Sequence, residues 1–168
     1  MQNTRPDPVD FGGYVSTCKI EGVIMEFISG TRKLSLNIDG YEYPSAVEGS
    51  DANWLVIAIK AKCDGEIWQA KAPCMRASEL IELRAWLNDL PSPRDGRIDF
   101  TENELTFLFD ARRQVILVLL DFHFHPKGDA YQYLVDRGYA IEFDMRDVDV
   151  GKLTSALDDL IKNTRFAS

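Results

Sequence analysis

The strongest structural signal in this sequence is the segment Ile57-Ala58-Ile59-Lys60-Ala61-Lys62-Cys63-Asp64-Gly65-Glu66-Ile67-Trp68-Gln69-Ala70-Lys71-Ala72. Asp64-Gly65 predicts a two-residue β-hairpin loop, because a type I′ turn needs positive φ at both central positions. Pairing Cys63 with Glu66 makes one face of the hairpin apolar and the other polar. A slip of one residue would mix the two faces, so the pattern itself supports this register. The polar face then carries three lysines, Lys60, Lys62 and Lys71.

Alternation with a period of two recurs on both sides of this hairpin and predicts further half-buried strands. Gly40 interrupts one of them and indicates a bulge or turn. Ser29-Gly30-Thr31 indicates a turn between the first two strands. The alternating apolar sets are Val23, Met25 and Phe27; Leu34, Leu36 and Ile38; Leu105, Phe107 and Phe109; Ile116, Val118, Leu120, Phe122 and Phe124; and Tyr139, Ile141, Phe143 and Met145.

Two segments have helical periodicity. Ser78 is the expected N-cap of a central helix that runs to about Asp89 and ends before Pro91. A second amphipathic helix is expected from about Val150 to Lys162.

A meander of strands with only two helices argues against βαβ crossovers. We therefore expect an α+β fold with a mainly antiparallel, curved sheet of about six to eight strands. The central and the C-terminal helix should pack on one face of that sheet. Residues 1–20 read as an irregular N-terminal extension, because prolines and glycines break any period, and residues 21–168 as a single domain.

The composition limits the classes of partner. The chain has 168 residues, 27 of them acidic against 19 basic, which gives a formal charge of −8. Such a charge repels nucleic acid and anionic membranes and attracts basic partners. No apolar run reaches the ~18 residues of a membrane span, and the polar first ten residues lack a secretory signal. We therefore expect a cytoplasmic protein in which the three cysteines, Cys18, Cys63 and Cys74, are free and buried.

The search for catalytic motifs leaves one alternative. No nucleotide-binding, metalloprotease or serine-hydrolase motif occurs. Period two would place Asp121, His123 and His125 on one strand face, a set that suits Zn, Fe or Mn. The other face of that strand belongs to the core, so the default reading of these residues is a solvated surface. We accordingly expect no enzyme activity, cofactor or metal, with a metal-dependent enzyme as the alternative.

The aromatic residues divide into two groups. Trp54, Trp68 and Trp86 lie in or beside apolar stripes and are expected in the core. Tyr131 and Tyr133 fall in the polar segment between Pro126 and Gly138, where exposed tyrosines beside acids would suit a protein interface.

Two stretches resemble the opening signature of the WapI-like immunity family: Ile38-Asp39-Gly40-Tyr41-Glu42-Tyr43-Pro44 and Asp51-Ala52-Asn53-Trp54-Leu55-Val56. The order of later features is similar too: a hairpin, Pro73-Cys74, a helix with Glu82-Leu83 and Trp86-Leu87, then Phe100-Thr101-Glu102, an aromatic strand and a closing helix. The resemblance runs from about Met25 to the C-terminus. It does not extend to residues 1–24.

The resemblance implies a bacterial, cytosolic antitoxin that binds a cognate polymorphic toxin domain, often a nuclease, and blocks it stoichiometrically. A basic nuclease cleft would attract an acidic partner. The contact surface expected from the residues is a polar face and loop formed by Asp121, His123, Tyr131, Tyr133, Glu142 and Asp144. The lysines of the hairpin make their side of the sheet a less suitable contact for a basic toxin. A structural subunit of a larger assembly is a third hypothesis.

Overall fold

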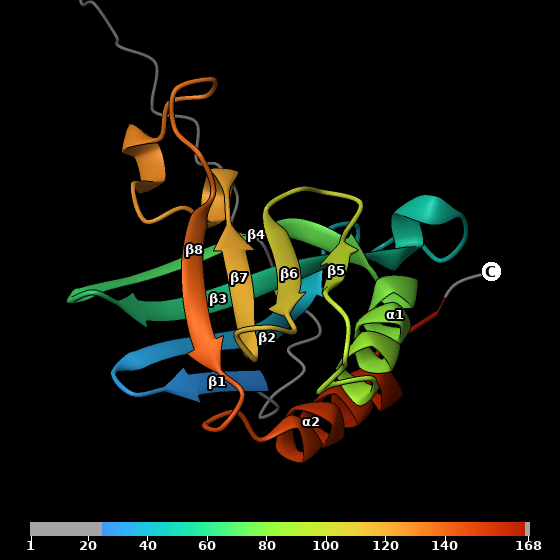
Figure 1. Cartoon of the computed structure of the whole chain (residues 1–168). Helices are drawn as coiled ribbons and strands as arrows, with labels where there is room; N and C mark the ends of the chain where they lie inside the picture. Colours follow the sequence, from blue (N-terminus) through green and yellow to red (C-terminus); the bar gives the residue numbers. More distant parts are fainter. Residues whose placement is uncertain (1–24, 167–168) are drawn as a thin grey trace, which may run out of the picture.

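The computed structural model describes residues 25–166, which form two four-stranded antiparallel sheets and two α-helices (Figure 1). The α+β class and the antiparallel pairing expected from the sequence are confirmed. The strands are divided between two sheets rather than joined in one curved sheet. The expected extension over residues 1–20 lies outside the described residues, as do Val23 and Cys18.

Sheet A has the strand order β1-β2-β3-β4. Its strands are β1 (Met25–Ser29), β2 (Arg32–Tyr41), β3 (Trp54–Cys63) and β4 (Glu66–Arg76). The β3–β4 hairpin has the predicted register throughout, from Cys63 opposite Glu66 to Ile57 opposite Ala72. Asp64 and Gly65 have φ values of 51° and 84°, as a type I′ turn requires. The register shift at Gly40 confirms the expected bulge.

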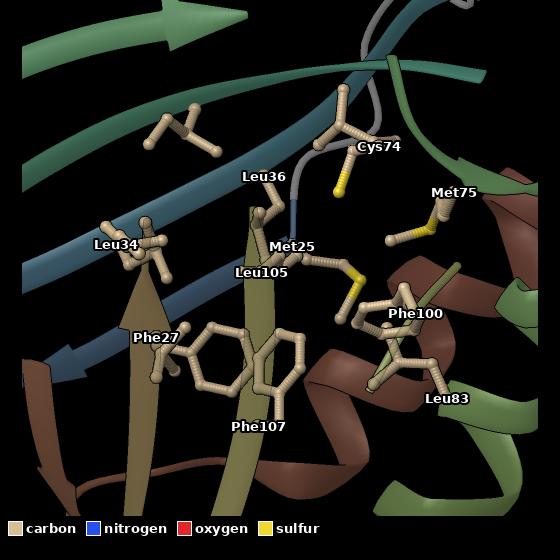
Figure 2. Close-up of a cluster of buried hydrophobic side chains, with 14 of the residues drawn as sticks. Met25, Phe27, Leu34, Leu36, Cys74, Met75, Leu83, Phe100, Leu105 and Phe107 are labelled. Carbon is tan, nitrogen blue, oxygen red and sulfur yellow. The ribbon is translucent and has the colours of Figure 1, made fainter. Parts of the chain in front are cut away.

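Sheet B has the order β5-β6-β7-β8. Its strands are β5 (Gly96–Asp99), β6 (Leu105–Asp110), β7 (Val115–Leu120) and β8 (Tyr139–Asp144). In Figure 1 these strands run across those of sheet A. The inner faces meet at Phe27, whose ring centroid lies 5.5 Å from that of Phe107 (Figure 2). The ring centroid of Phe143 lies 5.6 Å from that of Phe27. This aromatic contact joins the two sheets into one core.

The two helices share the inner side of sheet A with sheet B. They are α1 (Ala77–Asn88) and α2 (Val150–Lys162), which lie beside each other in Figure 1. Figure 2 shows Leu83 of α1 pointing toward Phe100 and Met25. The bounds of α2 agree with the prediction.

The predicted N-cap of α1 is wrong. The helix is capped at Arg76, two residues before Ser78, because the carboxylate of Glu79 accepts a 2.7 Å hydrogen bond from the Arg76 backbone N–H. The other Glu79 oxygen accepts from the backbone N–H and the hydroxyl of Thr101, at 2.6 and 2.8 Å. Glu79 is buried, so one carboxylate fixes both the start of α1 and the segment after β5.

The described cysteines are free and buried, as expected, and the tryptophans lie in or beside the core. Cys63 and Cys74 are free and buried, and burial raises the pKa of the Cys74 thiol well above its usual value. Trp68 and Trp86 are partly buried against the core. Trp54 is also partly buried, with the guanidinium of Arg76 5.2 Å from its ring centroid. Within residues 25–166 no helix has the length and apolar character needed to cross a bilayer.

Candidate partner-binding loop

The residues between β7 and β8, 121–138, form what is here named the aromatic loop. The sequence pattern continued β7 through Phe124, and this prediction is wrong. The strand ends at Leu120, and Phe122–Phe124 form a 3-10 turn in which Phe122 has φ 44°. Asp121, His123 and His125 therefore do not share a strand face.

The base of the aromatic loop is fixed to the core. The Asp121 backbone N–H donates to the Glu104 carbonyl at 2.9 Å. The indole N–H of Trp68, on β4, donates to the Phe124 carbonyl at 3.0 Å, and the Phe124 side chain is fully buried. These contacts, with the residue before β6 and with β4, hold the chain where it leaves β7, so the loop departs in a defined direction.

The two histidines have different surroundings. His125 is buried, and its Nδ1 accepts a 3.1 Å hydrogen bond from the Lys127 backbone N–H. The rings of Tyr131 and Tyr139 pack against it at centroid distances of 5.1 and 6.1 Å. His123 is largely exposed, and its Nδ1 lies 3.1 Å from Oε1 of Glu104. His125 thus supports the loop, and His123 is exposed to solvent beside Glu104.

The structure does not bring Asp121, His123 and His125 together on one face, as the alternative metal site requires. His125 Nδ1 is occupied by a backbone donor, and the turn directs His123 toward Glu104 instead of toward His125. In the described part of the chain, no three histidine, cysteine, aspartate or glutamate side chains gather closely enough to hold a metal ion.

Tyr131 joins the middle of the loop to its start. Its hydroxyl donates a 2.7 Å hydrogen bond to Oδ1 of Asp121, which raises the pKa of Tyr131 to about 12. The ring of Phe122 lies between the two predicted tyrosines, 5.8 Å from Tyr131 edge to face and 5.8 Å from Tyr133 in a stack. A hollow of about 380 Å³ opens here. Its lining residues are Phe122, His123, Gly128, Asp129, Tyr131 and Tyr133.

The tip of the loop exposes three consecutive large apolar side chains. Tyr133, Leu134 and Val135 are 69%, 89% and 70% exposed. Leu134 also has φ 72°, a left-handed conformation that is unfavourable for a residue with a branched side chain. The sequence analysis named Tyr133 as a candidate contact residue and did not name its two exposed neighbours. The signal that could have found them is an apolar triplet in a segment without helical or strand periodicity.

Glu142 and Asp144 lie apart from the other predicted contact residues. Leu120, just before Asp121, pairs with Tyr139, so Glu142 and Asp144 lie three and five residues further along β8, roughly 10 and 16 Å away. Each carboxylate has an arginine partner: Arg113 bonds Glu142 at 2.6 Å and Arg146 bonds Asp144 at 2.6 Å. Hydrogen bonds from Arg146 lower the pKa of Asp144 to about 2. The six residues thus form a loop group and a strand group.

The residues that carried the resemblance have structural roles. The Arg165 guanidinium lies 4.5 Å from the ring centroid of Tyr41 and ties the C-terminal end to β2. Phe100 is buried edge to face against Phe107, and Thr101 bonds Glu79. These positions stabilise the fold and do not form the loop surface.

Comparison with known proteins gives one match. The model of the immunity protein WapI-like family matches residues 25–165, well over half of the chain. No curated protein and no solved structure matches the chain.

Proposed function

The chain belongs to the WapI-like immunity protein family, and we propose that it binds a cognate toxin domain through the aromatic loop and blocks it by occupying its surface. The complex is stoichiometric and involves no catalysis. The protein acts in the bacterial cytoplasm, where it protects the cell that makes the toxin.

One observation carries the assignment of the loop. Tyr133, Leu134 and Val135 are adjacent, apolar and largely exposed, on a loop whose base is held by buried residues. Exposed apolar residues scattered singly need no explanation, but a contiguous group marks an interaction site, and tyrosine is among the residues that most often dominate binding. Because hydrogen bonds and ring contacts already order the loop, binding costs little conformational entropy.

Charge supports a basic partner. The chain carries a net charge of −8, and Asp129 is exposed on the wall of the hollow beside the tip. Glu142 and Asp144 form a separate rim along β8, where each carboxylate has an arginine partner. A net acidic charge, with an acidic group beside the apolar anchor, attracts a basic surface such as a nuclease cleft and raises the association rate. We therefore propose a basic nuclease domain as the toxin.

The test uses the toxin domain encoded by the neighbouring upstream gene, expected at the variable C-terminus of a large secreted protein. Co-expression of this protein with the toxin domain should restore growth of cells that the toxin inhibits. Calorimetry of the purified pair should show a one-to-one complex. Tyr133→Ala should weaken the complex by about 2 kcal/mol, the threshold of an interface hot spot.

Tyr43→Ala is the matched control, because Tyr43 is also exposed and lies outside the aromatic loop. It should leave affinity and protection unchanged. Protection without a complex, or equal losses in both variants, would contradict binding through the loop.

A further inference from the structure

The face of sheet A turned away from sheet B carries a concentration of positive charge in an acidic chain. Lys33, Lys60, Lys62 and Lys71 project from it, against the two carboxylates Glu26 and Asp39. We name this surface the lysine face. Its charge is opposite in sign to the net charge of −8, so it attracts a different kind of partner from the aromatic loop.

The carboxylates on this face neutralise only two of the lysines. Lys33 bonds Glu26 at 2.6 Å and Lys71 bonds Asp39 at 3.1 Å. Lys60 and Lys62 are exposed and form no salt bridge with any residue between 25 and 166. Two ammonium groups are therefore available to an anionic partner.

The strand register places two lysines against each other. Lys33 lies directly opposite Lys62 in the β2–β3 ladder. Like charges at directly opposed positions destabilise a sheet. Lysines often protect an edge strand from aggregation, but β3 is an interior strand of sheet A. Glu26 already pairs with Lys33, so Lys62 is the member of this pair that a carboxylate of a partner would neutralise.

The same row has apolar ends. Ile28 pairs with Lys33, and Ile67 pairs with Lys62, so one line across all four strands reads Ile28, Lys33, Lys62, Ile67. The two isoleucines are 43% and 76% exposed. Apolar groups flanking positive charge suit a protein segment better than a free anion, because the isoleucines would bury apolar area only against a partner of comparable breadth.

The shape of the face agrees with an extended segment. Next to this row a groove of about 450 Å³ lies over β2, β3 and β4. Ala58, Lys60 and Gln69 are among its lining residues, together with Lys71 and its ion-pair partner Asp39. Lys60 and Lys62 are two residues apart on one strand, roughly 6.6 Å. Alternate side chains of an extended peptide have the same spacing, so two carboxylates could meet both lysines at once.

We propose that the lysine face binds an extended acidic segment of a protein partner, at a site separate from the aromatic loop. The segment runs along β3, and carboxylates at alternate positions of the segment pair with Lys60 and Lys62. The chain then has two binding surfaces, one for a basic toxin and one for an acidic segment.

The test uses a fluorescent peptide of alternating threonine and glutamate, ten residues long like β3, and a neutral counterpart with glutamine. Wild-type protein should bind the acidic peptide at low salt and not the neutral one, as measured by anisotropy. Lys60→Glu with Lys62→Glu should lower the affinity about tenfold or more, since repulsion replaces attraction.

The control is Lys152→Glu with Lys162→Glu on α2, which changes the net charge equally at two exposed positions. It should change the affinity less than twofold by comparison. Equal losses in both double variants, or no binding by the wild type, would overturn the proposal. The readout is independent of the toxin, so failure here leaves the loop assignment unaffected.

Nuclear magnetic resonance of the wild-type protein gives the same answer without any substitution. Titration with the acidic peptide should shift the backbone amides of Lys60, Lys62 and Gln69 and leave those of α2 in place. Shifts confined to other elements would assign the binding to a different surface and contradict the proposal.

Discussion

The hydroxyl of Tyr131 donates a 2.7 Å hydrogen bond to Oδ1 of Asp121, and this bond closes the first half of the aromatic loop on itself. The same Asp121 oxygen accepts from the Phe122 backbone N–H. The carboxylate therefore stabilises the turn that ends β7 and, through Tyr131, the segment that leads to the exposed tip. A rigid support of this kind lets the tip reach a partner without first becoming ordered.

Tyr131→Phe should destabilise the protein in a manner that depends on pH. The pKa of Tyr131 is raised from 10.0 to about 12, chiefly because the hydrogen bond to Asp121 stabilises the protonated phenol. A raised pKa contributes stability that is fully present below pH 10 and is lost as the pH rises through about 12. The difference in urea unfolding free energy between wild type and Tyr131→Phe should therefore be constant at neutral pH and shrink above pH 10. A difference that does not change with pH would contradict the hydrogen bond.

Leu134→Gly should separate toxin binding from stability. Glycine relieves the strain of φ 72° in the folded state, which raises the unfolding free energy. Its greater freedom in the unfolded chain lowers the unfolding free energy. The two effects are each on the order of 1 kcal/mol and nearly cancel. The unfolding free energy should stay within about 1 kcal/mol of the wild type, while the binding free energy for the toxin should weaken by about 1.5–3 kcal/mol, the value for a leucine side chain that binding buries fully. Urea unfolding and calorimetry measure the two quantities.

Val47→Gly is the control for this prediction, because Val47 is similarly exposed and has an ordinary φ. It should leave toxin affinity unchanged. If Leu134→Gly also binds normally, the strained tip has no role in recognition.

The parts of the fold that local pattern determines were predictable. The β3–β4 register follows from the type I′ turn and the two-sided pattern between Ile57 and Ala72, and α2 follows from its apolar stripe. The division into two sheets was not predictable in this way. Alternation shows which side chains face the core, but it does not show which strands pair, and β4 and β5 are separated by α1.

The end of β7 and the start of α1 were also mispredicted, because tertiary contacts determine both. Alternation continued through Phe124, but the Trp68 indole takes the Phe124 carbonyl and the chain turns at Phe122. The start of α1 was missed because its capping carboxylate, Glu79, is held by Thr101, which lies 22 residues away. In each case a contact distant in the sequence overrides the local preference.

Glu79→Ala should cost about 3 kcal/mol of unfolding free energy. The carboxylate accepts hydrogen bonds from the Arg76 N–H and from both donors of Thr101, and the site is buried. Removing a charged acceptor leaves these donors unsatisfied, at about 1–3 kcal/mol for each group that stays buried. Denaturant unfolding measures the loss. Glu82→Ala, at an exposed position of α1, should cost less than about 0.5 kcal/mol, and equal costs would contradict the structural role of Glu79.

Phe27→Ala should destabilise the protein by about 3–5 kcal/mol, the range for a buried phenylalanine. The ring is fully buried and contacts Phe107 and Phe143 of sheet B. The neighbouring Ile28→Ala is the control, because Ile28 points to the other face and is partly exposed. It should cost less than about 1 kcal/mol. Similar losses in thermal or urea unfolding would show that the two sheets do not meet at Phe27.

Charge reversal along β8 should slow the association of a basic toxin. Glu142→Lys with Asp144→Lys removes two carboxylates and leaves their partners Arg113 and Arg146 unpaired, so the rim becomes strongly positive. The association rate in stopped-flow mixing should fall by about tenfold at low salt and recover as the Debye length shortens to about 8 Å at physiological ionic strength.

Asp158→Lys with Asp159→Lys is the control, because it is matched in net charge and also leaves an arginine unpaired, Arg84. A smaller effect in this α2 variant assigns the steering to β8. Equal slowing would assign it to net charge and remove Glu142 and Asp144 from the contact surface.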